Sequence, residues 1–153
     1  MIATQLDASE PAMAFREQRA WIGLVSLLAY VPYFALAPAA AEGDVRGLLV
    51  RLGWFAACSL ARALLFFAPL LWLVRRTPRI DRASPDERDR AIDRRAASAA
   101  YYLLMAEMVV VGIMMPFGKS GWEIVDAALL SIILSEGLRE VVIVRSYRRG
   151  WHG

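Results

Sequence analysis

The stretch LGWFAACSLARALLFFAPLLWLV, residues 52–74, decides the fold of this chain of 153 residues. It contains one charged residue, Arg62, which lies near its centre. A helix needs about 20 predominantly apolar residues to cross the roughly 30 Å hydrocarbon core of a bilayer, and this stretch is long enough. The sequence therefore predicts a membrane-spanning helix that carries a guanidinium near mid-membrane.

The composition agrees with a membrane protein. Hydrophobic residues make up 58% of the chain, more than is usual in soluble domains, and the mean hydropathy is +0.42. The net charge of +3 alone would suit a nucleic-acid partner, but the basic residues gather in blocks at the ends of apolar runs. Acidic residues interrupt these blocks and spoil any stripe suited to phosphates, so we expect no nucleic acid as a partner.

Three further stretches are apolar and long enough to cross a bilayer, which gives four predicted spans. The predicted spans are residues 20–41, 48–74, 96–117 and 122–144. The turns EGDVRG and GKSG are short, so the spans form two helical hairpins, and the fold class is an all-α four-helix transmembrane bundle. The connection 75–95 is longer and rich in arginine, and its SPDE motif predicts a helix from about residue 85 with Ser84 as the N-cap. The motif SGWE predicts a second capping box, with Ser120 as the N-cap of the fourth span.

Arginine placement predicts the orientation. Arginines concentrate before the first span, in the connection 75–95 and after the fourth span, whereas the two short turns hold few. The positive-inside rule then puts both termini and the connection in the cytoplasm, which for a bacterial protein means the inner membrane. The small-residue run ALAPAAA at 35–41 resembles a signal-peptide cleavage site, but the segment before it is too long for a signal peptide, so we expect the first span to be retained.

The two halves of the chain follow the same order at an offset of about 75 residues. Each has a helix start with serine and proline, a span and a tight hairpin. Both halves enter the membrane from the same side, so they would form a parallel 2+2 repeat. The alternative is that any two helical hairpins look alike at this level.

The residue types that carry most chemistry are scarce. Cys58 is the only cysteine and His152 the only histidine, which excludes an internal disulfide, a bis-histidine haem site and a histidine-rich metal site. The sequence also contains no nucleophile–base pattern and no glycine-rich phosphate loop. We therefore expect no enzyme activity, no cofactor and no metal.

Ionisable residues inside the predicted spans are the main candidates for function, because such residues normally face the bundle interior and pair. Arg62 lies roughly 19 Å and Glu107 roughly 16 Å above the cytoplasmic ends of their helices, at about 1.5 Å per residue. Matching depth predicts that Arg62 pairs with Glu107, with Glu136 as second choice. The full predicted polar network is Arg62, Glu107, Glu136, Arg139, Ser131 and Ser135. It either fixes helix register or lines a binding site or ion pathway.

The arginines at the start of the connection predict a contact surface. These residues are Arg75, Arg76, Arg79 and Arg82. Clustered arginines beside a span attract anionic lipid headgroups, and the alternative is a docking site for a cytoplasmic protein.

The stretch DERDRAIDRRA, residues 86–96, runs directly into an apolar span. It resembles the juxtamembrane helix of small, uncharacterised bacterial four-span inner-membrane proteins, in which a DERE-like tetrad precedes an alanine-rich helix start. The resemblance implies the same location and topology, and it implies no activity and no site residues.

Two functions fit these observations best. The favoured one is a non-enzymatic accessory or regulatory membrane protein. The alternative is a transporter or channel subunit for an anionic or zwitterionic solute, with Arg62, Glu107 and Glu136 along the path. Four spans make a thin wall, so the second function requires a homo-oligomer.

Overall fold

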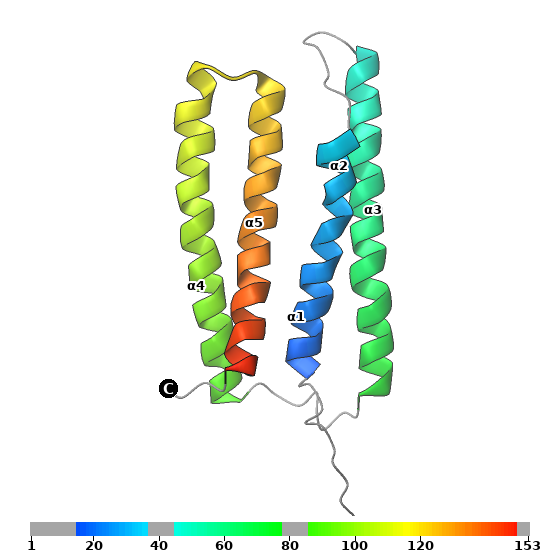
Figure 1. Cartoon of the computed structure of the whole chain (residues 1–153), viewed down its shortest axis with the longest axis vertical. Helices are drawn as coiled ribbons and strands as arrows, with labels where there is room; N and C mark the ends of the chain where they lie inside the picture. Colours follow the sequence, from blue (N-terminus) through cyan, green and yellow to red (C-terminus); the bar gives the residue numbers. More distant parts are fainter. Residues whose placement is uncertain (1–14, 37–44, 78–85, 150–153) are drawn as a thin grey trace, which may run out of the picture.

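A computed structural model describes residues 15–36, 45–77 and 86–149. Within these ranges the chain is helical and has no strand. The long helical segments run alternately up and down (Figure 1). The elements are α1 (Phe15–Ser26), η1 (Leu27–Tyr30), α2 (Val31–Leu36), α3 (Val45–Arg76), α4 (Glu87–Val109), η2 (Val110–Met114), η3 (Met115–Phe117) and α5 (Gly121–Arg148).

The helix starts follow the local sequence. The capping box predicted from SGWE is present: the Glu123 backbone N–H donates to Ser120 Oγ, and the Ser120 backbone N–H donates to the Glu123 carboxylate. At α4 the helix begins at Glu87, and the preceding Asp86 makes no side-chain cap hydrogen bond. The predicted cap at Ser84 lies outside the described residues.

Three of the four segments are long and apolar enough to cross a membrane. They are Phe15–Leu36, Val45–Arg76 and Glu87–Phe117. The fourth, α5, has 28 residues but does not meet the same standard of composition, because it carries charged side chains in its interior. These are Asp126, Glu136, Arg139 and Glu140.

The helices lie in the order α4, α5, α1, α3 (Figure 1). The outer two expose most of their apolar side chains. Only 11% of the apolar stretch of α3 and 6% of that of the α4 segment is buried within the chain. A soluble bundle would turn these faces inward. The packing thus leaves wide apolar surfaces on both flanks.

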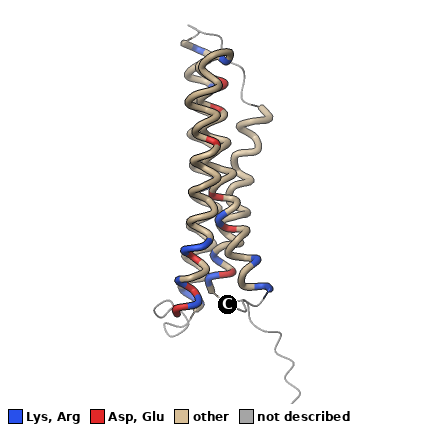
Figure 2. The backbone as a smooth tube through the Cα atoms, turned by 90° about the vertical axis from the view of Figure 1, so that its left-hand side faces the viewer, with Lys and Arg blue, Asp and Glu red and all other residues tan. Residues whose placement is uncertain are grey.

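The described charges gather at one end of the bundle. Figure 2 shows blue and red segments concentrated at the lower end, where α1 and α4 begin and α3 and α5 finish. A small apolar core holds the three segments α1, α4 and α5 together there. It consists of Ala20, Ile92, Ala96, Ile143 and Val144.

The packing of the helices does not show the parallel 2+2 repeat. A two-fold relation between the hairpins would make α1 against α5 equivalent to α4 against α3. Among the described residues α1 packs closely on α5, whereas α4 and α3 have no comparable contact. The similarity between the two halves of the sequence is therefore not matched by a symmetric arrangement of the helices.

Candidate functional site

Two arginine–carboxylate pairs join α3 to α5, one above the other. These helices run in the same direction on either side of α1 (Figure 1). We call Arg51–Asp126 the upper ion pair and Arg62–Glu136 the middle ion pair. Since both arginines come from α3 and both carboxylates from α5, the two pairs act as cross-links between these two helices.

The upper ion pair is enclosed and has several further partners. Arg51 Nε donates to the hydroxyl of Tyr33 at 3.3 Å, and that hydroxyl donates to Asp126 Oδ1 at 2.9 Å. The guanidinium carbon also lies 5.3 Å from the ring centroid of Trp122, a distance typical of a cation–π contact. The side chains of Arg51 and Asp126 are 10% and 28% exposed. This arrangement is suited to holding α2, α3 and α5 together.

Sequence reasoning does not find the upper ion pair: neither Arg51 nor Asp126 is among the predicted site residues, although both lie inside predicted spans. A signal was present, because both residues fall in the second turn of helices that start at the same end of the bundle.

The middle ion pair corrects the predicted partner of Arg62. Arg62 binds Glu136, which was the second choice, and the predicted pair with Glu107 is wrong. Glu107 instead accepts a hydrogen bond from Ser135 Oγ at 3.0 Å. The reason is lateral: α5 packs on α4 and α3 does not, so a carboxylate on α4 at the correct height is on the wrong neighbour.

The middle ion pair is also more open than the upper one. The side chains of Arg62 and Glu136 are 29% and 45% exposed. Tyr30 covers one side, with its ring centroid 5.6 Å from the guanidinium carbon, and its hydroxyl lies 3.4 Å from Ser59 Oγ. The contacts within this chain thus leave the middle ion pair partly exposed.

Two other members of the predicted network lie elsewhere. Ser131 is buried and donates to the backbone oxygen of Ala127 in its own helix at 2.8 Å, so it provides close packing without touching the charges. Arg139 contacts Asp93 at 3.8 Å and Glu140 at 3.1 Å, away from the middle ion pair. Neither of these two contacts is with another member of the predicted network.

Arg139 belongs to a set of charges at the lower end, which we call the charged base. Its ion pairs are Arg16–Asp89, Arg16–Asp93, Arg139–Asp93, Arg139–Glu140 and Arg148–Glu17. They connect the start of α1, the start of α4 and the final turns of α5. The Tyr147 hydroxyl donates a hydrogen bond to Asp89 here. Burial and, to a lesser extent, this hydrogen bond raise the pKa of the Tyr147 hydroxyl. The charged base thus fixes three helix ends to one another.

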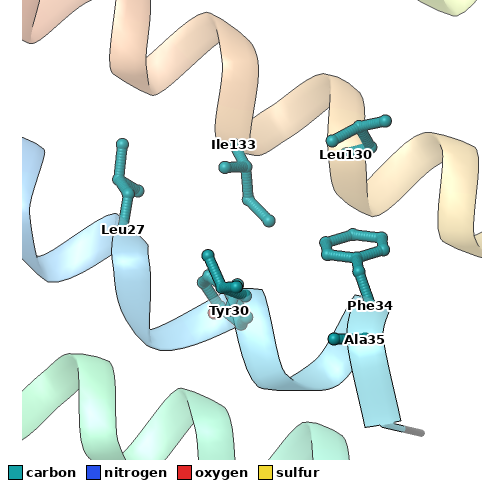
Figure 3. Close-up of a pocket in the computed structure, with 7 residues that line it drawn as sticks. Leu27, Tyr30, Phe34, Ala35, Leu130 and Ile133 are labelled. Carbon is teal, nitrogen blue, oxygen red and sulfur yellow. The ribbon is translucent and has the colours of Figure 1, made fainter.

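An apolar pocket of about 510 Å³ opens between α5 and the segment η1–α2 (Figure 3). It is lined by Leu27, Tyr30, Val31, Phe34, Ala35, Leu130 and Ile133. None of the three residues proposed for a solute path is part of this lining. The pocket therefore suits an apolar group and not a charged solute.

The predicted contact surface is described only in part. Arg75 and Arg76 form the end of α3, and the Arg76 guanidinium carbon lies 4.0 Å from the ring centroid of Trp72. Arg79 and Arg82 lie outside the described residues. In the part of the chain that the structure describes, no group of three or more histidine, cysteine, aspartate or glutamate residues could hold a metal ion.

Comparison of the chain with protein-family models, with curated proteins and with solved structures finds no match.

Proposed function

We propose that this protein is a four-span integral protein of a bacterial inner membrane, with both termini in the cytoplasm, and that it acts as a non-enzymatic accessory or regulatory protein. The observation that carries the proposal is the exposure of the apolar faces of α3 and α4. Exposed apolar surface of this extent is costly in water and favourable in lipid. The exposed large side chains include Leu60, Leu64, Phe67, Tyr102, Ile113 and Met114.

The pairing of its charges supports α5 as the fourth span. A lone charge deep in a bilayer costs about 2.5–3.5 kcal/mol or more, and pairing within the protein reduces this cost. Asp126 and Glu136 both pair with arginines of α3, and Arg139 pairs with Asp93 of α4. With these charges satisfied, a helix of 28 residues is long enough to cross the hydrocarbon core.

The charged base supports the proposed orientation. Arginines that flank the spans gather at the lower end in Figure 2, and the positive-inside rule assigns such an end to the cytoplasm. Arg75 and Arg76 end α3 on the same side and are suited to anionic headgroups or a cytoplasmic protein.

The accessory role rests on what the polar residues do in the bundle. Arg51, Asp126 and Tyr33 bond to one another, and the pairs of the charged base join helix ends. Side chains used in this way hold helices in register, and they are not free for chemistry.

One observation favours the alternative of a transporter or channel subunit. The middle ion pair is partly exposed, and Glu107 accepts a hydrogen bond from Ser135, the residue next to Glu136 in α5. In proteoliposomes we expect no flux of chloride or of an anionic dye above that of empty vesicles. Flux that disappears in Glu107→Gln would favour the alternative.

Cysteine accessibility tests the topology. In a Cys58→Ser background, Lys119→Cys should react with a membrane-impermeant maleimide added to intact cells, and Asp86→Cys should react only after the membrane is opened. Both side chains flank long helices, at opposite ends of the α4 segment. Labelling of Asp86→Cys from outside would overturn the orientation, and recovery of the protein in the soluble fraction would overturn the membrane assignment.

A further inference from the structure

A stripe of α5 beside the middle ion pair is only partly covered within this chain. Val125 and Ile132 are 50% and 47% exposed, and Glu136 continues the stripe one helical turn further on. The spacing of seven and then four residues places all three on one side of the helix. That spacing is typical of a helix seam that packs against another helix.

The position of this stripe matters because Glu136, the carboxylate of the middle ion pair, belongs to it. Glu136 lies well inside α5, and Arg62 lies near the centre of α3, far from either end. In the proposed membrane setting, lipid tails would face a guanidinium and a carboxylate that are 29% and 45% exposed. Lipid offers these groups no hydrogen bonds, so another protein surface is the suitable cover.

The charges of the middle ion pair indicate which protein surface is suited to cover it. A guanidinium has five N–H donors and a carboxylate about four acceptor positions, so one Arg62–Glu136 contact leaves capacity for a second partner. An Arg–Glu pair beside a two-fold axis is complementary to its own copy, because rotation brings each arginine next to the other copy's glutamate.

We propose that a second copy of this chain covers this stripe, so that two middle ion pairs meet at a two-fold axis and form a closed ring of alternating charges. This proposal rests on the proposed membrane location. Val125 and Ile132 supply the apolar part of the contact, and Arg62 and Glu136 supply its specificity.

Cross-linking within the membrane tests the proposed face. In a Cys58→Ser background, Ile132→Cys should give a dimer band with a flexible bismaleimide in native membranes. Leu134→Cys is the matched control, because it is 49% exposed at nearly the same depth but points to the opposite side of α5. Equal or weaker cross-linking of Ile132→Cys, in protein recovered from the membrane, would overturn the dimer and leave the membrane assignment intact.

A charge swap tests the ring. A copy with Arg62→Glu and Glu136→Arg keeps its internal pair, and two swapped copies remain complementary to each other. A swapped copy beside an unchanged copy brings like charges together, so capture of one by the other through different tags should fall about tenfold or more. Undiminished mixed capture would overturn the ring. If the swapped copy does not reach the membrane, the cross-linking comparison decides the proposal alone.

Discussion

The upper and middle ion pairs use the same chemistry between the same two helices, yet their surroundings differ. Arg51 and Asp126 share the Tyr33 hydroxyl, Arg51 also lies against Trp122, and the two side chains are 10% and 28% exposed. Arg62 and Glu136 have Tyr30 on one side and are 29% and 45% exposed. A paired charge can therefore complete a structure or leave it open to a partner. The side chains that cover the pair decide between these two outcomes, more than the pair itself does.

The largest effect is expected at the upper ion pair. Arg51→Leu leaves Asp126 unpaired in an enclosed site, which typically costs about 3–5 kcal/mol of stability. The double variant Arg51→Leu/Asp126→Leu should recover much of the loss. Thermal unfolding in detergent measures both losses of stability, and a loss no larger than that of Arg62→Leu would show that the upper ion pair is not the more enclosed one.

A smaller loss is expected at the middle ion pair. Arg62→Leu should cost about 1–3 kcal/mol, because solvent or detergent reaches the abandoned carboxylate of Glu136. Adding Glu136→Leu should recover part of this loss, whereas adding Glu107→Leu should be additive, since Arg62 and Glu107 are not paired. Non-additivity with Glu107 alone would restore the pairing predicted from depth.

The hydroxyl groups beside the two pairs give a sharper contrast. Tyr33→Phe removes a hydroxyl that bonds both Arg51 and Asp126 and should cost about 1.5 kcal/mol. Tyr30→Phe removes a hydroxyl with one long contact to Ser59 and should cost about 0.5 kcal/mol or less. The same unfolding assay compares them, and a larger effect at Tyr30 would contradict the assignment of the enclosed site.

The smallest effects concern the serines of α5. Ser135→Ala removes the hydrogen bond to Glu107 and should cost about 1 kcal/mol. Ser131→Ala removes a bond to its own helix backbone and should be close to neutral, within about 0.5 kcal/mol. Equal losses would show that Ser135 contributes only its size.

The sequence predicted the helices better than it predicted their neighbours. Apolar length and the SGWE motif are local signals, so the long helices and the capping box at Ser120 could be predicted. Depth along a helix is local too, but which helix lies alongside is set by packing. The depth of Arg62 along its helix therefore indicated which carboxylates lie at a suitable height, but it could not decide between Glu107 and Glu136.

The charged base shows a second limit of the same reasoning. Arg139 lies on one face with Ser131 and Ser135 by helical spacing, yet it contacts Asp93 on α4. A long side chain can turn away from the stripe to which its backbone belongs.

The order in which the helices are synthesised has a consequence for the two arginine–carboxylate pairs. Asp126 lies 75 residues after Arg51, and Glu136 lies 74 residues after Arg62. In the proposed membrane setting α3 emerges with two guanidinium groups whose counter-charges are not yet made. The first hairpin must therefore wait beside the insertion machinery, or tilt its arginines toward water, until α5 arrives. A chain cut after Phe117 would never receive those counter-charges, and we expect quality-control proteases to remove it.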